Sequence, residues 1–289
     1  MTARPPLLTV IIATYNWSSV LPYSIASVLA QTFEDLELLV IGDGCSDDSE
    51  AVVQAIDDRR VRWINLPANI GHQSGPNNEG LREARGQFIA YLGHDDLWLP
   101  HHLECLVSSM RSGAAVAYAI TEMVGPEGSY AEMVPLSTRY RPGDWLPPSC
   151  VVHRRSVTDH VGGWLHFREL DTDPERELWT RAHECGHRFA FVPRLTTIKF
   201  PALWRRDAYR KRPCHEQAAW LERIQSDRDF ELFEMARIRA GTDGFLLEGA
   251  KRIWRRLSIG SPLVRPMRKG RLHEIRRRFK GLEHNVRKN

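Results

Sequence analysis

The stretch that decides the fold is FIAYLGHDDLWLP, residues 88–100. Its first five residues are apolar with no polar alternation, which predicts a strand buried on both faces of a largely parallel sheet. The apolar run stops at Gly93-His94-Asp95-Asp96. Open α/β sheets bind their ligands at the carboxyl ends of such strands, so two carboxylates stand where a ligand site is expected.

Two interpretations of the pair Asp95 and Asp96 are open. Adjacent carboxylates repel each other, and both stay ionised at a low free-energy cost only in water or beside a cation. Mg²⁺ or Mn²⁺ is usually held by one or two carboxylates together with substrate phosphates, which predicts a metal–phosphate site. A solvated turn that caps the next helix would use the same residues, because Asp is common in both places.

The composition is that of a soluble globular chain, with 289 residues of which 42% are hydrophobic. No apolar run approaches the roughly 18 residues that span a bilayer. The N-terminal run LLTVIIA, residues 7–13, is expected to be a first core strand and not a signal peptide. Five scattered cysteines without a C-x-x-C pair favour neither a zinc ribbon nor a disulfide framework, so we expect a cytoplasmic protein.

Positive charge is concentrated in the C-terminal tail. Residues 251–289 carry 14 Lys or Arg against two Glu, a local charge of +12, whereas the rest of the chain is mildly acidic. A basic segment with interspersed apolar residues suits an anionic membrane surface, which would place the protein peripherally at the inner membrane face. Nucleic acid is the other usual partner of such charge and is the less favoured one here, while a solvated tail is the third alternative.

Strands and helices alternate through the first hundred residues. Strands are predicted at 7–13, 36–42, 61–65 and 88–92, and helices at 18–30, 49–57 and 79–85, with a loop over 69–78 and Gly86 as a helix cap. This order predicts a parallel, doubly wound sheet. Neither G-x-G-x-x-G nor a P-loop follows the first strand, which argues against dinucleotide-binding and P-loop proteins.

The second half is expected to extend the same sheet. Further strands are predicted at 114–121 and 189–192, helices at 176–186 and 215–240, and a variable loop at 122–144.

Three blocks in this first half resemble family 2 glycosyltransferases of the GT-A fold. They are VIIATYNW, VIGDGCSDDS and NIGHQSGPNNEGLREARGQFIAYLGHDDLWLP, in that order over residues 8–100, and the similarity continues more weakly to about residue 200. The resemblance implies an α/β fold with a doubly wound, mostly parallel sheet flanked by helices. It implies a GT-A domain over 1–212, with a nucleotide-sugar half (1–100) and an acceptor half (101–212), before a helical, basic C-terminal extension (213–289).

The resemblance also implies an activity. It is the inverting transfer of a sugar from a nucleotide-diphospho-sugar, a UDP-sugar being favoured, to a hydroxyl of a glycan or lipid-linked glycan, as in polysaccharide biosynthesis. A divalent ion that bridges the two phosphates would stabilise the charge that develops on the leaving group.

Donor-site residues follow from the resemblance by position. It places Thr14, Tyr15 and Asn16 at the nucleotide base, Asp43 in a hydrogen bond to the base, and Asn78 with Gly80 at the donor site. The family's D-x-D motif falls on Gly93-His94-Asp95, so the carboxylate that often contacts the ribose is replaced by Gly93, and His94 is a candidate polar contact. Asp95 and the adjacent Asp96 are the predicted ligands of Mg²⁺ or Mn²⁺.

The catalytic base is expected just before the segment Leu178-Trp179-Thr180-Arg181. In the family an E-D pair stands there and its Asp takes the acceptor proton. This chain has Glu175 at that place and Asp173 close by, so both are candidates. An inverting transfer needs one carboxylate near the attacking hydroxyl. Acids in the first turn of a helix, where the dipole favours them, are the alternative interpretation.

Other functions remain as alternatives. A catalytically degenerate relative that only binds nucleotide is suggested by Gly93 and by the incomplete E-D pair. A nucleotidyltransferase is disfavoured, because no Gly-rich turn with Arg or Lys follows the first strand. A nucleic-acid-binding protein has only the basic tail in its favour.

Overall fold

A computed structural model of the chain describes residues 4–126, 131–135, 137–242 and 271–282. In these ranges the strands belong to one nine-stranded sheet. They are β1 (Leu8–Thr14), β2 (Leu36–Gly42), β3 (Val61–Asn65), β4 (Phe88–Gly93), β5 (Leu97–Trp98), β6 (Val116–Val124), β7 (Ala131–Val134), β8 (Val151–Arg154) and β9 (Phe189–Lys199).

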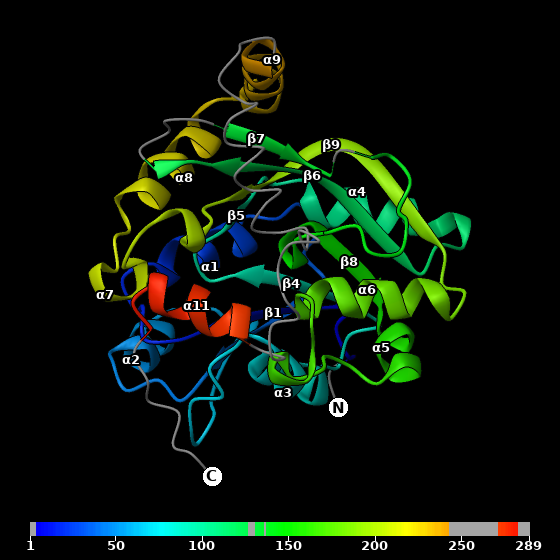
Figure 1. The fold of residues 1–289 in the computed structure, drawn as a ribbon. Helices are drawn as coiled ribbons and strands as arrows, with labels where there is room; N and C mark the ends of the chain where they lie inside the picture. Colours follow the sequence, from blue (N-terminus) through cyan, green and yellow to red (C-terminus); the bar gives the residue numbers. More distant parts are fainter. Residues whose placement is uncertain (1–3, 127–130, 136, 243–270, 283–289) are drawn as a thin grey trace, which may run out of the picture.

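Helices flank this sheet and continue beyond it (Figure 1). They are α1 (Leu21–Leu29), α2 (Ser49–Gln54), α3 (Ser74–Glu83), α4 (His102–Ser109), α5 (Arg155–Val161), α6 (Pro174–Glu184), α7 (Ala208–Lys211), α8 (His215–Ser226), α9 (Phe230–Thr242) and α11 (Arg271–Phe279). Within the part of the chain that the structure describes, no helix is both long enough and apolar enough to cross a bilayer.

The strand order is β3-β2-β1-β4-β8-β6-β9-β5, with β7 beside β6. The first four strands are parallel, so the predicted doubly wound arrangement is confirmed for them. Strand β8 then runs antiparallel to both β4 and β6, and β6 is again parallel to β9. The predicted α/β class with a mostly parallel sheet between helices is therefore confirmed.

The central strands are buried on both faces, as their uninterrupted apolar runs predict. In β1, Val10 and Ile12 pack into the core shared with α1 and α4, whereas Ile11 packs into the core shared with α5 and α6. Because consecutive side chains of a strand point to opposite faces, such a run fills two cores at once. This double packing holds the strand ends, and the loops that follow them, in fixed positions.

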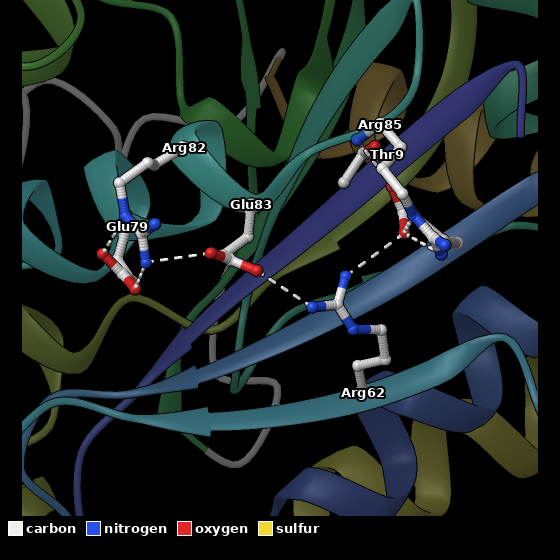
Figure 2. A network of polar contacts seen from close by, with 7 residues as sticks. Thr9, Arg62, Glu79, Arg82, Glu83 and Arg85 are labelled. Atoms are coloured by element: carbon white, nitrogen blue, oxygen red, sulfur yellow. Dashed lines mark hydrogen bonds and ion pairs between the residues drawn. The ribbon is translucent and has the colours of Figure 1, made fainter. Parts of the chain in front are cut away.

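A charged residue is nevertheless buried near the amino-terminal end of β2. Glu37 of β2 is 2% exposed, and its carboxylate accepts hydrogen bonds from the Thr9 hydroxyl (2.8 Å) and from the Arg85 guanidinium (2.5 Å). Figure 2 shows the surrounding network, in which Arg62 lies 3.0 Å from Glu83 and 3.7 Å from Glu37. A buried carboxylate is tolerated when it is paired and hydrogen-bonded in this way, and the network ties the end of α3 to β2 and β3.

The segment before β4 differs from the prediction. Helix α3 begins at Ser74, inside the predicted loop 69–78, because Pro76 stands in its first turn, where a missing N–H costs nothing. The helix ends at Glu83 with an extended Ala84, so Gly86 is not its cap. A Cβ at Gly86 would lie 2.5 Å from the Thr9 nitrogen, so this glycine allows the chain to pass close to β1.

The second half differs from the prediction in several places, and helix α5 is additional to it. Strand β9 continues seven residues past the predicted end at 192, and Ala131–Val134 of the predicted loop pairs with β6 as strand β7. The predicted helix 215–240 is two helices, α8 and α9, with the break between Ser226 and Phe230.

Helices after residue 212 pack onto the sheet domain. Trp220 and Ile224 of α8 and Phe230 of α9 share a core with Leu97 and Leu99. The tail helix α11 is attached at its end to α7, where the Asp207 N–H donates to the Phe279 carbonyl (3.0 Å). The predicted division at residues 212 and 213 remains a prediction, and residues 243–270 and 283–289 of the basic tail lie outside the described residues.

Candidate active site

A cavity of about 280 Å³ opens at the carboxyl ends of β1, β2 and β4. Seven of the residues singled out from the sequence line it: Thr14, Tyr15, Asp43, His94, Asp95, Asp173 and Glu175. The other three, Asn16, Asn78 and Asp96, do not. The cavity is also lined by Lys199 at the end of β9 and by Arg276, Arg277 and Lys280 of the tail.

Asp96 points away from the cavity into the protein. Its carboxylate is fully buried and accepts hydrogen bonds from the Ser149 hydroxyl (2.5 Å), the Lys199 ammonium (2.7 Å) and the Phe200 N–H (3.2 Å). Burial opposes the charge on Lys199, but the carboxylates of Asp96 and Asp95 outweigh burial and raise the pKa of the ammonium. Asp96 is thus a structural anchor that fixes the end of β9 to the turn after β4.

Asp95 has the opposite environment. Its carboxylate lines the cavity, and no other residue in the described ranges donates a hydrogen bond to it. Burial and the neighbouring Asp96 raise the pKa of Asp95, because both disfavour its charged form. Of the two predicted metal ligands, the geometry brings only Asp95 to the cavity.

The structure explains why residue 93 is a glycine in this chain. A Cβ at this position would lie 2.6 Å from Oδ2 of Asp96 and 3.3 Å from Oδ1 of Asp95. The space that the first carboxylate of a D-x-D motif would need is therefore filled by the inward-turned side chain of Asp96.

His94 is held by the protein on both sides of its ring. Its Nδ1 is 2.9 Å from the Thr14 hydroxyl oxygen and its Nε2 is 3.4 Å from the Tyr209 hydroxyl oxygen, while Trp17 packs edge-on at 5.3 Å. Burial lowers the pKa of His94, so the imidazole is neutral. These contacts position the β4 turn against β1.

Asp43 organises the loop that forms one wall of the cavity. Its two carboxylate oxygens accept the N–H groups of Ile70 (2.8 Å) and Gly71 (2.9 Å), and Asn69 donates its side-chain amide to the same group. Burial raises the pKa of Asp43, against the effect of these hydrogen bonds. Each carboxylate oxygen has more than one lone pair, so Asp43 keeps capacity to accept a further hydrogen bond at the cavity.

The two asparagines hold the framework instead of lining the cavity. Asn16 adopts a left-handed conformation (φ 46°), and its side-chain oxygen accepts the Ser46 N–H at 2.7 Å, which joins the loops after β1 and β2. Asn78 exchanges two hydrogen bonds with the backbone of Trp164 (2.8 and 2.9 Å). Because α3 begins at Ser74, Asn78 lies in its second turn and faces the loop after α5.

Glu175 and Asp173 stand together at the start of α6. Glu175 is 9% exposed and its Oε1 accepts the Trp145 indole N–H at 2.9 Å. Burial and the nearby charge of Asp173 raise the pKa of Glu175. Asp173, in contrast, forms an ion pair with Arg276 of α11. A carboxylate with a raised pKa at the edge of a cavity is suited to accept a proton.

Cationic side chains also line the cavity, and none of them is among the site residues named from the sequence: Arg176, Lys199, Arg276, Arg277 and Lys280. Arg176 lies in α6, Lys199 ends β9, and the other three come from the basic tail. Arg276 and Arg277 lie in the last turn of α11 and Lys280 directly follows it, but nothing in the sequence shows which part of the protein these side chains meet.

The side chains present fit a hard divalent cation that takes most of its ligands from the substrate and from water. In the described ranges no cluster of three or more His, Cys, Asp or Glu could enclose a metal ion. Asp95 offers a single carboxylate without a competing donor, which suits Mg²⁺ or Mn²⁺ bound chiefly by phosphate oxygens.

Comparisons with known proteins agree on one family. The family model for glycosyl transferase family 2 matches residues 9–160. A Campylobacter jejuni GalNAc(5)-diNAcBac-PP-undecaprenol β-1,3-glucosyltransferase is 37% identical over 115 residues, covering 38% of this chain and 36% of that protein. The Escherichia coli UDP-Glc:α-D-GlcNAc-diphosphoundecaprenol β-1,3-glucosyltransferase WfgD is 36% identical over 104 residues, 36% of this chain and 41% of WfgD. The matched segments therefore span about two fifths of the length of these two relatives.

Solved structures share the fold at low identity. Staphylococcus aureus TarS 1–349 in complex with UDP superposes with a TM-score of 0.57 at 17% identity, over 85% of this chain and 78% of that one. The mannosyltransferase PcManGT from Pyrobaculum calidifontis, in complex with GDP-Man and Mn²⁺, gives a TM-score of 0.54 at 14% identity, over 87% and 79%. The predicted GT-A architecture is thereby confirmed.

Proposed function

The chain belongs to glycosyl transferase family 2, and on that premise we propose that it moves a sugar from a nucleotide-diphospho-sugar to a hydroxyl acceptor, with a divalent metal ion. One observation carries the proposal. Asp43, Asp95 and Glu175, from three separate segments, line one cavity at the carboxyl ends of the parallel strands. They correspond to the nucleotide, metal and acceptor parts of a transfer site.

The donor is proposed to bind along the ends of β1, β2 and β4. Tyr15 and the loop 69–71, held by Asp43, would contain the base, and the diphosphate would reach Asp95. Asp95 would hold Mg²⁺ or Mn²⁺, which would neutralise charge on the departing diphosphate. Two fold neighbours support a nucleotide donor, because one was solved with UDP and the other with GDP-Man and Mn²⁺. A UDP-sugar is favoured, because the WfgD relative is named for UDP-Glc.

Glu175 is proposed as the general base. Its raised pKa suits a group that takes a proton from a hydroxyl near neutral pH, and Trp145 fixes its orientation. Asp173 is held in an ion pair with Arg276, and its negative charge raises the pKa of Glu175, so its proposed role is to increase the basicity of Glu175. A single base beside the acceptor supports one direct displacement, and therefore inversion at the anomeric carbon.

The acceptor is proposed to be a lipid-linked glycan. Two relatives are named for undecaprenol-linked substrates, which supports this class. On the outer face of α11, Ile275 and Phe279 are 49% and 44% exposed one turn apart, next to the exposed Arg278. Apolar side chains flanked by Arg suit an anionic bilayer surface, which supports peripheral membrane attachment through the tail.

Release of nucleoside diphosphate tests the proposal. The full chain is incubated with Mn²⁺, a panel of UDP- and GDP-sugars and undecaprenyl-diphosphate-linked sugars in detergent. We expect release of one nucleotide to depend on both donor and acceptor and to fall at least about 100-fold in Glu175→Gln. An NMR spectrum of the product gives the anomeric configuration. A well-folded chain that binds nucleotide but transfers no sugar would instead support the degenerate relative.

A further inference from the structure

Helix α11 and the residue that follows it present three cationic side chains to the cavity. Arg276, Arg277 and Lys280 line the cavity together with residues at the strand ends, although they come from the basic tail. In Figure 1 this helix, drawn in red, lies near α7 and in front of β1. The position is unexpected for a segment whose composition suggested an appendage.

Contacts at both ends of this face fix its orientation. The N–H groups of Asp207 and Tyr209 donate to the carbonyls of Phe279 (3.0 Å) and Lys280 (2.9 Å). Arg276 is in an ion pair with Asp173. Arg276 therefore has its counter-ion within the protein, and the other two cations remain to be accounted for.

Arg277 is an incompletely bonded guanidinium at the nucleotide end of the cavity. Its Nη1 atom is buried and has no hydrogen-bond partner among the residues that the structure describes. A Cβ at Gly71 would lie 2.4 Å from this atom, and Gly71 has a φ of +88°, so glycine leaves the space that Arg277 enters. Asp43 and Tyr15 interact electrostatically with the guanidinium. A buried donor left unpaired is costly, and a ligand that accepts its hydrogen bond removes that cost.

Lys280 also lacks a bonding partner, at the end of the cavity next to the predicted metal ligand Asp95. Its ammonium makes no ion pair or hydrogen bond within the described ranges, and it feels the attraction of Asp95 and the repulsion of Lys199 and Arg276. Burial together with these two cations lowers the pKa of Lys280. An anionic ligand at Asp95 would supply the missing counter-charge.

We propose that α11 is part of the donor site, with Arg277 donating hydrogen bonds to the nucleoside and Lys280 binding the diphosphate. The inference rests on the proposed function and deepens it. The two unpaired cations lie at opposite ends of one cavity, Arg277 beside the predicted base subsite and Lys280 beside the predicted metal ligand. This order matches a nucleoside diphosphate laid along the strand ends.

Calorimetric titration of the full chain with Mn²⁺ tests the proposal. The probes are UDP, GDP and dTDP, and then the monophosphate of whichever one binds. We expect Arg277→Ala to weaken diphosphate and monophosphate alike by about 10- to 100-fold, because it removes charge-assisted hydrogen bonds to the nucleoside. Lys280→Ala should weaken the diphosphate about tenfold and the monophosphate less. Arg277→Lys should restore only part of the loss, because an ammonium lacks the planar fork.

Arg278→Ala is the matched control, since it removes the same charge from the same helix at an exposed position outside the cavity. It should bind nucleotide as the wild type does. Unchanged or tighter binding in Arg277→Ala and Lys280→Ala, with Asp95→Asn still losing metal-dependent binding, would overturn the inference and make α11 a plug over the site. If the folded wild type binds none of the three diphosphates, the proposed function itself fails. Arg277→Gln replaces Arg277→Ala if the latter does not fold.

Discussion

Asp95 and Asp96 are adjacent and chemically identical, yet the structure gives them opposite roles. Asp96→Asn leaves the Lys199 ammonium, which is 19% exposed, without the carboxylate that lies 2.7 Å away. Breaking a buried pair by removing one partner costs about 3–5 kcal/mol. Because Lys199 retains some water and Asn still accepts one hydrogen bond, we expect a loss of about 3 kcal/mol. In a chain of this size that lowers Tm by roughly 6–12 °C.

Asp95→Asn is the matched control, the same chemical change one residue earlier. Asp95 has a raised folded-state pKa, so its ionised form is disfavoured by folding and its contribution to stability decreases as the pH rises above its usual range. At pH 7 and in EDTA, Asp95→Asn should therefore leave Tm unchanged or raise it. The measurement is differential scanning calorimetry of both variants under these conditions.

The pairing itself can be isolated with a second substitution. In the double variant Asp96→Asn/Lys199→Met the unpaired charge is gone, so part of the lost stability should return. The reasoning is refuted if Asp96→Asn has the same Tm as the wild type, or if Asp95→Asn and Asp96→Asn lower the Tm by the same amount.

Three further predictions follow from other contacts. Trp145→Phe removes the N–H that donates a hydrogen bond to Glu175, which should raise the pKa of this carboxyl. The acid limb of the pH–rate profile for sugar transfer should therefore shift to higher pH by about one unit, and an unshifted acid limb would argue against Glu175 as the base. Burial and then Glu234 raise the pKa of Glu122 to about 8, so its contribution to stability is present below about pH 4.5 and is lost as pH rises through 8. The Tm of Glu122→Gln should therefore rise relative to the Tm of the wild type between pH 5 and pH 9, and a Tm difference that does not change with pH would contradict this. In a flotation assay with anionic liposomes, the wild-type chain should float with the liposomes and the double variant Ile275→Asp/Phe279→Asp should not. Equal flotation of the two would show that α11 does not contact the membrane.

Much of the donor side could be predicted from the sequence, because parallel strands bring their carboxyl ends to one edge. Thr14, Asp43 and Asp95 each follow such a strand, and the structure places all three at one cavity. Short apolar runs bounded by polar turns were sufficient for that prediction.

The sequence could not separate Asp95 from Asp96, because local patterns do not show which of two adjacent side chains turns inward. That choice depends on Ser149, Lys199 and the Phe200 N–H, which are distant in sequence. Asn78 was placed at the donor site by its position, and the earlier start of α3 turns it toward Trp164 instead.

The tail could not be placed from the sequence at all. Arg277 of α11 and the following Lys280 line the cavity, and contacts with Asp173, Asp207 and Tyr209 hold this segment in place. Charge and periodicity predict that such a helix has a polar face, but they do not indicate whether that face meets water, a membrane or the active site.

Metal-dependent nucleotide binding tests the central claim most directly. Calorimetric titration of the wild type with UDP, GDP and dTDP, each in Mn²⁺ and in EDTA, should show one nucleotide that binds only with metal. Asp95→Asn, which is expected to keep at least the wild-type Tm, should abolish that binding. Binding that is the same in EDTA, or that survives in Asp95→Asn, would contradict a metal–diphosphate site at the end of β4.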